Sequence, residues 1–142
     1  MEKGNNVHKT IQRMTEIVSS GEEDDILTIL AEHVTFLPPT YYRSWVGRNA
    51  VAAVLGHVGH VFTDFSYRRI LGEGNDWALE FSCKVGDLDG VGVDLITLDS
   101  DGLISKIEVV MRPHKTVGAL RDAMNMRVMR DPRFLEFPKA LT

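Results

Sequence analysis

The chain has 142 residues, of which 44% are hydrophobic and 25% charged, so we expect one soluble domain large enough to bury an apolar core. Its net charge of −4 at pH 7 argues against nucleic-acid partners, and its one cysteine, Cys83, excludes an internal disulfide and a multi-cysteine metal site. The polar first residues lack the apolar segment of a signal peptide, and no apolar run approaches the roughly 20 residues of a membrane span, so we expect a cytoplasmic protein without membrane contact.

Two helices are expected at the start of the chain. Apolar residues recur at spacings of three and four over residues 6–19, which is the pattern of an amphipathic helix. Ser20 and Glu23 then have the spacing of a capping box. This pair predicts a second short helix within residues 21–32, and the acidic residues of its first turn suit the positive end of the helix dipole.

A short strand and a third helix follow. Residues 33–37, HVTFL, have the composition of a strand, which Pro38 ends. The next segment, TYYRSWVG, predicts a loop that is unusually rich in large aromatic side chains. The apolar stripe after Gly47 predicts a helix over residues 48–62.

The second half of the chain has the pattern of an antiparallel sheet. Apolar and polar residues alternate over residues 77–86, which predicts a half-buried strand. The segments DLDG and DSDG are hairpin signals. They predict two further strands over residues 90–98 and 103–112, which continue an antiparallel meander.

The order of these elements predicts the fold class. Helices come first, the sheet follows, and an amphipathic helix over residues 115–130 ends the pattern. This order is typical of an α+β fold. No repeat, linker or low-complexity run divides the chain, so we expect a single domain over residues 1–142 with its core at about 6–130.

Asp94 is a carboxylate in the middle of an apolar strand. A two-residue turn at Asp89-Gly90 pairs it with Val85, and closure of the DSDG loop pairs it with Ile107, so both hairpins place it on an apolar face. Burial there predicts a raised pKa for the Asp94 carboxyl. Two roles remain open: the protonated carboxyl donates a hydrogen bond to a ligand carbonyl, or the group holds the fold by accepting bonds from its neighbours.

The opposite face of the same strands is also apolar. A sheet that is apolar on both faces needs cover on both. We therefore expect helices and a pocket on the Asp94 side and a second copy of the chain on the other side, which makes a homodimer. The residues expected on this outer face are Val91, Val93, Leu95, Ile104 and Val110.

The sequence resembles the nuclear transport factor 2-like superfamily, in its bacterial branch of ketosteroid isomerases, limonene-epoxide hydrolases and SnoaL-like polyketide cyclases. The resemblance rests on Ile11 to Gly21, on AEHVTF, on the helix start at Gly47 and on VDLITLDSDGLISKIEVV. It implies a cone in which a curved antiparallel sheet wraps over helices, with an apolar pocket at the open end. It also implies dimers that form through the outer sheet face.

The ketosteroid isomerases imply a role for one position. Asp94 matches their oxyanion-hole aspartate, a protonated carboxyl that donates a hydrogen bond to the substrate oxygen. Their hydrogen-bonding tyrosine falls at Met14, and their general-base aspartate falls at Pro38. Neither side chain transfers protons, so ketosteroid isomerisation by that mechanism is not expected.

The other two relatives imply further positions. The Arg-x-Asp pair of the epoxide hydrolases falls at Phe81 and Cys83, and the last-strand aspartate of the hydrolases and cyclases falls close to Arg112. The residues that activate water in the hydrolases are therefore absent. Asp94 is the one carboxylate that remains from these sets.

The candidate catalytic residues are Asp94 and His33. A histidine at the start of the first strand suits a general base near neutral pH, with a structural role as its alternative. The expected ligand-binding residues come from the helices, the strands and the aromatic loop: Met14, Phe36, Tyr41, Tyr42, Trp45, Val54, Val58, Phe81, Cys83, Ile96, Ile107, Val109, Met111 and Arg112.

Several of these residues have a structural alternative. The aromatic loop also suits packing over the helices or at the dimer edge, and Arg112 also suits pairing with Glu108 or Glu80 at the end of the sheet. Cys83 is expected as a small hydrophobic side chain, because no base is placed to ionise it. His57 and His60 lie one helical turn apart without further ligands, so we expect no metal and no cofactor.

Two classes of function follow. The first is an isomerase, dehydratase or cyclase that acts on an apolar carbonyl compound, which Asp94 polarises. The second is a non-catalytic module that binds an apolar ligand or serves for dimerisation.

Overall fold

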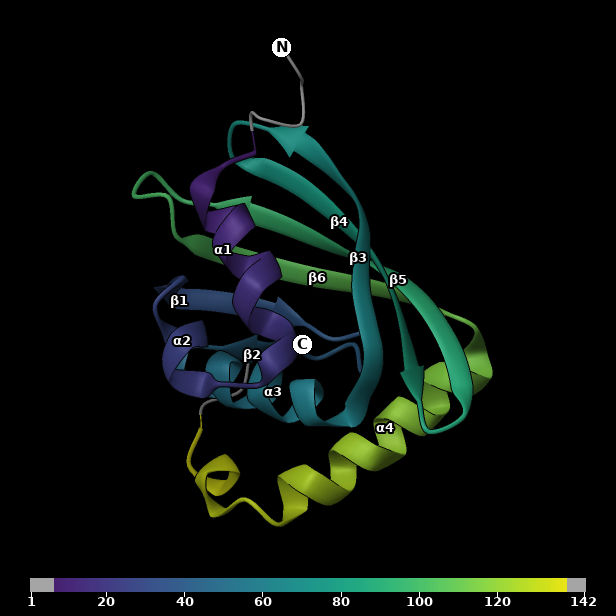
Figure 1. Cartoon of the computed structure of the whole chain (residues 1–142). Coiled ribbons are helices and arrows are strands. Elements are labelled where there is room, and N and C mark those ends of the chain that lie inside the picture. The colour runs from purple at the N-terminus through teal and green to yellow at the C-terminus, as the bar shows by residue number, and fades with distance from the viewer. Residues whose placement is uncertain (1–6, 138–142) are drawn as a thin grey trace.

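A curved sheet of six strands wraps around the N-terminal helices in the computed structural model, which describes residues 7–137 (Figure 1). The strand order is β2-β1-β6-β5-β4-β3, and all neighbours are antiparallel except β1 and β6, which are parallel. The strands are β1 (Leu30–Leu37), β2 (Trp45–Val46), β3 (Phe62–Glu73), β4 (Asp76–Val85), β5 (Leu88–Leu98) and β6 (Ile104–Arg112). The α+β class and the curved sheet are confirmed, with one parallel pair in addition.

Three helices fill the concave side of the sheet, and a fourth crosses its lower end beside them (Figure 1). The helices are α1 (Lys9–Ile17), α2 (Glu23–Leu27), α3 (Arg48–Val61) and α4 (His114–Met129), with 3₁₀ turns at Val18–Ser20 and Pro132–Leu135. One apolar face of α1 packs in the core through the buried side chains of Ile11, Met14 and Ile17. The helices expected over 48–62 and 115–130 are thus observed within one residue of their expected bounds.

The second helix differs from its expectation in both start and length. Its N-cap is Glu22 with no side-chain cap, and the Ser20 hydroxyl accepts a hydrogen bond from the backbone N–H of Glu22 instead, so the capping box does not form. The helix is short because β1 already begins at Leu30, three residues before the expected strand. Parallel pairing of Leu30 with Ile104 of β6 accounts for this early start.

The hairpin between β4 and β5 turns at Gly86 and Asp87 instead of Asp89-Gly90, because Val85 pairs with Leu88. Gly86 has φ 60°, which suits a tight turn. Gly90 lies inside the strand, where a Cβ would come within 2.9 Å of side-chain carbons of Met111 and Thr116, so this glycine permits close packing. The expected register was therefore wrong.

The face of Asp94 is nevertheless as expected. Asp94 pairs with Leu79 instead of Val85, and with Val109 instead of Ile107. Both differences are an even number of residues, and side chains alternate between the two faces along a strand. Asp94 therefore stays on the concave, apolar face.

The outer face has one member fewer than expected. The pairing of β5 with β6 shifts between Thr97 and Leu98, and the shift turns Ile104 into the core, where it is fully buried. Leu95 and Val110 are 41% and 56% exposed on the outer face, and Val91 and Val93 are half-buried between the strands.

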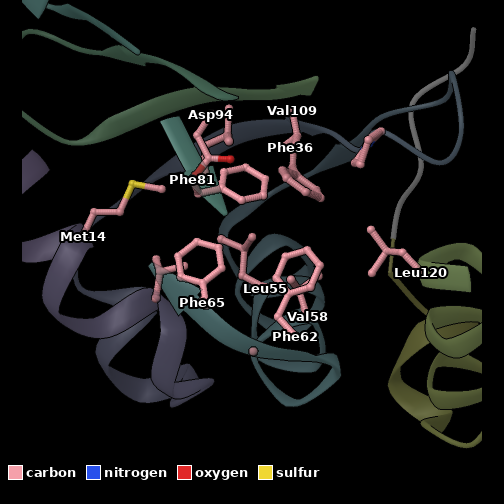
Figure 2. Close-up of a pocket in the computed structure, with 14 residues that line it drawn as sticks. Met14, Phe36, Leu55, Val58, Phe62, Phe65, Phe81, Asp94, Val109 and Leu120 are labelled. Carbon is pink, nitrogen blue, oxygen red and sulfur yellow. The ribbon is translucent and has the colours of Figure 1, made fainter. Parts of the chain in front are cut away.

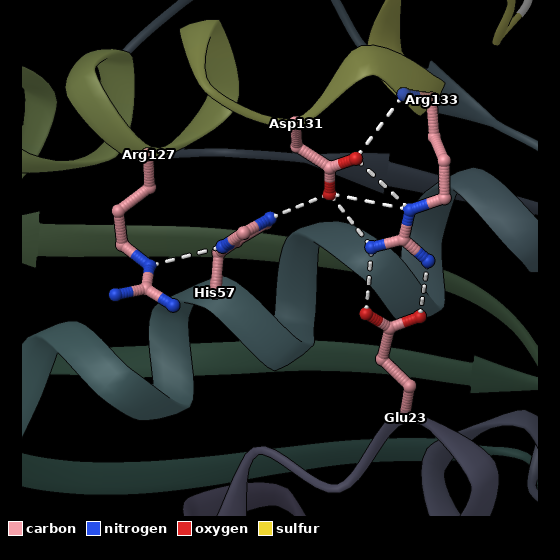
Figure 3. Close-up of polar contacts among 5 residues, drawn as sticks. All are labelled: Glu23, His57, Arg127, Asp131 and Arg133. Carbon is pink, nitrogen blue, oxygen red and sulfur yellow. Dashed lines mark hydrogen bonds and ion pairs between the residues drawn. The ribbon is translucent and has the colours of Figure 1, made fainter.

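The C-terminal segment folds back onto the helices and extends the core beyond residue 130. Phe134 is buried, with its ring edge against Trp45 at 5.2 Å between centroids and its face tilted against His57. Polar contacts hold the same segment (Figure 3). His57 of α3 contacts Asp131 through Nε2 and accepts a hydrogen bond from Arg127 through Nδ1.

Arg133 joins this segment to the N-terminal helices. Its guanidinium donates to both carboxylate oxygens of Glu23 in α2, at 2.8 and 2.9 Å, and to Asp131. We call Glu23, His57, Arg127, Asp131 and Arg133 the ionic network. It connects α2 and α3, on the concave side of the sheet, with α4 and the C-terminal segment.

Candidate functional site

A pocket lies between the helices and the concave face of the sheet (Figure 2). Its lining residues are Met14, Val18, Phe36, Pro39, Leu55, Val58, Gly59, Phe62, Phe65, Phe81, Asp94, Ile107, Val109 and Leu120. Asp94 is the one titratable side chain among them. A mostly apolar wall with a single polar group is typical of sites for small apolar molecules.

The open space in this pocket is small. The centre of a water molecule can reach about 50 Å³ of it. A cavity needs about 10–15 Å³ by this measure to hold one water, so the pocket has room for about four water-sized groups. A ligand larger than this must move side chains of the wall.

Three phenylalanine rings, which we call the phenylalanine wall, stack on one another beside Asp94. Phe65 stacks on Phe81 at 5.2 Å between centroids and on Phe62 at 5.7 Å, with interplanar angles of 26° and 14°. Phe62 and Phe65 share one face because β3 is irregular between Thr63 and Ser66, where Asp64 has φ 51°. These rings provide a surface for a planar or cyclic apolar group.

Asp94 has one hydrogen-bond partner among the described side chains. The hydroxyl of Tyr67 on β3 donates to Oδ2 of Asp94 at 3.1 Å, across the intervening strand β4. Asp94 is 7% exposed, and its backbone neighbours in β4 and β6 are Leu79 and Val109. No cationic side chain compensates its charge in the described part of the chain.

This environment changes the acidity of both groups. Loss of solvent raises the pKa of Asp94 to about 7, and the hydrogen bond from Tyr67 partly opposes that rise. Burial, together with the neighbouring carboxylate, raises the pKa of Tyr67 well above its ordinary value. Near neutral pH, Asp94 is therefore poised between its two protonation states, while Tyr67 keeps its proton.

Several residues expected at the site do line this pocket. They are Met14, Phe36, Val58, Phe81, Asp94, Ile107 and Val109. Val54 and Ile96 are buried in the adjoining core instead, and Met111 is half-buried at the end of β6 against Gly90.

His33 is not brought to Asp94. It is exposed and lines a separate surface cleft with Glu32, Arg48 and Phe137. Successive side chains of β1 point to opposite faces, so His33 lies away from the concave face that the buried Val34 and Phe36 occupy.

The aromatic loop also lies outside the pocket wall. Tyr41 bonds to Asn125 and lies under the guanidinium of Arg121, and Tyr42 is 90% exposed. Trp45 packs on the C-terminal segment.

The two remaining expected residues do not contact the pocket either. Arg112 is exposed on the outer face because it pairs with Val91 in β5. Cys83 is buried, and burial raises the pKa of its thiol to about 11, which fits an inert hydrophobic side chain.

Sequence reasoning missed eight residues of the site: Val18, Pro39, Leu55, Gly59, Phe62, Phe65, Leu120 and, behind Asp94, Tyr67. Leu55 belongs to the stripe that predicted α3, but nothing in that stripe distinguishes pocket from core. The aromatic spacing in FTDFSY was the available signal for β3. The bulges in this strand break the alternation that would have made the signal clear.

Neither a metal-binding cluster nor a membrane-spanning helix occurs within residues 7–137. No group of three or more His, Cys, Asp or Glu side chains among them has the geometry to hold a metal ion. None of the helices in this range is long and apolar enough to cross a membrane.

Comparisons with known proteins agree with this fold. The family model of the SnoaL-like domain matches residues 11–107. An uncharacterised bacterial protein with a cystatin-like fold from Silicibacter pomeroyi is 67% identical, with 93% of this chain and 94% of that chain covered and a TM-score of 0.92. A search of curated protein sequences returned no match.

Two further solved structures are similar. A steroid delta-isomerase from Pseudomonas aeruginosa is 30% identical, with 92% of this chain and 95% of that chain covered and a TM-score of 0.82. A nuclear transport factor 2-like protein of unknown function from Burkholderia xenovorans shares the fold at 19% identity, with 80% and 91% covered and a TM-score of 0.66.

Proposed function

Because the chain belongs to the SnoaL-like domain family, we propose that it binds a small apolar carbonyl compound in the pocket beside Asp94. The protonated carboxyl of Asp94 donates a hydrogen bond to the carbonyl oxygen, and the phenylalanine wall contacts the apolar part of the ligand. The observation that carries this proposal is a single buried carboxyl in an otherwise apolar pocket.

The acidity of Asp94 supports a neutral ligand with an acceptor atom. With a pKa raised to about 7, the carboxyl is protonated in a large fraction of molecules at neutral pH. A carbonyl oxygen binds only this protonated form, so ligand binding favours protonation further. Binding of such a ligand is therefore expected to weaken as the pH rises above 7.

An enzymatic version of this proposal is an isomerase, dehydratase or cyclase. Asp94 would then stabilise the negative charge that develops on the substrate oxygen. The similar structure from Pseudomonas aeruginosa supports this version, because that protein is named as a steroid delta-isomerase. Such a reaction also needs a base to remove a proton from carbon.

The non-catalytic alternative, a module for ligand binding or dimerisation, is favoured by one observation. The described pocket wall contains no second titratable group, and His33, the expected base, lines a different cleft. Met14 lines the pocket where a ketosteroid isomerase is expected to have a tyrosine. Ligand binding therefore has direct support from the geometry, whereas proton transfer from carbon has none.

The test uses two probes of the same shape, cyclohexanone and methylenecyclohexane. The oxygen of the ketone is replaced by a CH₂ group in the hydrocarbon. At pH 6 we expect Asp94→Leu to lower the affinity for the ketone, relative to that for the hydrocarbon, by roughly 1–3 kcal/mol, because only the ketone can accept a hydrogen bond. Isothermal titration calorimetry measures both affinities. Asp89→Asn is the control, because Asp89 lies on the same strand but is exposed and paired with Lys84. An equal effect of Asp94→Leu on the affinities for both probes would refute the proposal.

We also propose that two copies associate through the outer sheet face. Leu95 and Val110 are exposed there beside the half-buried Val91 and Val93, and an apolar face of this kind is usually covered. Val93→Asp is expected to yield monomers or insoluble protein, whereas Ser100→Asp in the exposed β5–β6 turn is not. Light scattering measures the mass, and a native monomer at micromolar concentration would contradict this proposal.

A further inference from the structure

Tyr67 contacts two residues of the pocket, Phe65 and Asp94, from outside the pocket wall. It lies on the edge strand β3 and is not part of the pocket wall. Its ring packs edge-on against Phe65 of the wall, at 4.9 Å between centroids and 89° between planes. This contact directs the hydroxyl towards Asp94, to whose Oδ2 it donates at 3.1 Å.

The two oxygens of Asp94 therefore differ. Oδ2 accepts the hydrogen bond from Tyr67, and no described residue bonds to Oδ1. Yet no buried polar side-chain atom in the described part of the chain lacks a partner, so Oδ1 is not fully enclosed by protein. Because Asp94 lines the pocket and Oδ2 is already bonded to Tyr67, Oδ1 is the oxygen left to bond a ligand there.

We propose that Tyr67 is a positioning residue: by occupying Oδ2 as a donor, it confines the carboxyl proton of Asp94 to Oδ1 and aims it at the ligand oxygen. This inference rests on the proposed function. A carboxylic acid has one hydroxyl oxygen and one carbonyl-type oxygen, and a hydrogen bond from Tyr67 is best accepted by the carbonyl type. Tyr67 remains a donor throughout, because the pKa of its hydroxyl lies well above the ordinary value.

The same logic predicts the behaviour of an amide at this position. In Asp94→Asn, the amide oxygen is the only acceptor, so Tyr67 holds it in place of Oδ2 and the NH₂ group points into the pocket. A donor to the ligand is thus kept. Without the Tyr67 hydroxyl, nothing holds the amide oxygen away from the pocket, so the NH₂ group faces the ligand in only a fraction of the molecules and the apparent affinity falls by that fraction. The effect of Asp94→Asn therefore depends on Tyr67.

A double-mutant cycle tests this dependence with cyclohexanone as the probe and methylenecyclohexane as its matched hydrocarbon. We expect Asp94→Asn alone to retain most of the preference for the ketone. In the Tyr67→Phe background, the same substitution should reduce that preference by about 3- to 10-fold more, the range of one net hydrogen bond. Tyr41→Phe is the control, because Tyr41 is an exposed tyrosine bonded to Asn125. An equal effect of Asp94→Asn in both backgrounds would overturn the inference.

A second measurement separates positioning from mere support of the fold. The Tyr67 hydrogen bond lowers the pKa of Asp94, so Tyr67→Phe should raise it above the value of about 7, as followed by carboxyl ¹³C NMR. The other titratable groups that bear on this titration are Tyr67 itself on β3 and Cys83 on β4, and Cys83 stays neutral over this range. An unchanged titration in a folded Tyr67→Phe protein would contradict the role.

A substitution that should shift the pKa of Asp94 in the opposite direction separates the role of Tyr67 from a folding defect. Replacing Tyr67 by 3-fluorotyrosine makes the hydroxyl a stronger donor with little change in shape, so the pKa of Asp94 should fall instead of rising. The failure modes are distinct. If Asp94 of the native protein titrates near 4, the proposed function fails. If it titrates near 7 and neither change at Tyr67 moves it, only the positioning role fails.

Discussion

Charged side chains are organised in opposite ways in two regions of this molecule, the partly exposed ionic network and the buried pocket. In the ionic network, each carboxylate contacts a guanidinium, and the pKa values of Glu23 and Asp131 are lowered, chiefly by hydrogen bonds from Arg133 (Figure 3). In the pocket that Figure 2 shows, the neutral Tyr67 is the one partner of Asp94 among the described residues, and loss of solvent raises the pKa of Asp94 to about 7.

The difference indicates which region is structural and which is functional. The ionic network joins the C-terminal segment to α2 and α3 with its charges compensated, as a stabilising contact does. Asp94 lies in an apolar cavity without a compensating charge, which costs stability whenever the group ionises. A perturbed titratable group of this kind in a cavity is a candidate for function.

The largest expected effect is on the pH dependence of stability. The folded protein raises the pKa of Asp94 to about 7 from an unfolded value of about 4, so its stabilising contribution is present below pH 4 and is lost as the pH rises through 7. Asp94→Asn cannot ionise, so it should match the native protein near pH 4 and exceed its stability by about 2–4 kcal/mol at pH 9. Urea unfolding across this range measures the difference.

The same experiment on Asp94→Leu sharpens this prediction. It also removes the ionisable group, so its stability relative to the native protein should rise with pH in the same window. A native protein whose stability does not fall between pH 5 and pH 9 relative to both variants would show that Asp94 is solvated.

A substitution in the ionic network is expected to have a smaller effect on stability, and to lower it instead of raising it. Asp131→Asn removes the charge that Arg133 and His57 contact, and should lower the free energy of unfolding at pH 7 by about 1–2 kcal/mol. Because the pKa of Asp131 is lowered in the folded protein, this contribution is lost as the pH falls below about 4.

Its control is Asp89→Asn, which removes an exposed ion pair with Lys84 and should change stability by no more than about 0.5 kcal/mol. Ketone binding should survive Asp131→Asn, since Asp131 does not line the pocket. If Asp131→Asn abolished ketone preference while the protein stayed folded, the separation of the two regions would be wrong.

Much of the fold followed from alternation and helical spacing. The resemblance to nuclear transport factor 2-like proteins is confirmed by the SnoaL-like family match and by the similar structures. The segment GDLDG, residues 86–90, has a glycine at each end, so the sequence alone leaves the place of the turn open. In the structure the turn lies at Gly86, and Gly90 packs closely against Met111 and Thr116 inside the strand. The face of Asp94 did not depend on that choice.

The site was harder to predict than the fold. Asp94 was identified because a carboxylate breaks an apolar strand, which is visible in the sequence itself. Tyr67 and Phe65 were missed because they lie on a bulged edge strand. Leu120 reaches the pocket from α4, whose position is set by its contacts with the rest of the fold and not by its own pattern.

Asp94 is a desolvated carboxyl with a pKa raised to about 7 in an apolar pocket. Carboxyl ¹³C NMR of the native protein, with the resonance assigned by its loss in Asp94→Asn, tests this claim most directly. The structure predicts a midpoint near pH 7, well above the ordinary range for aspartate. A midpoint near pH 4 would contradict it, because the carboxyl would then be solvated, and the pocket assignment and the role of Asp94 as a donor would both be lost.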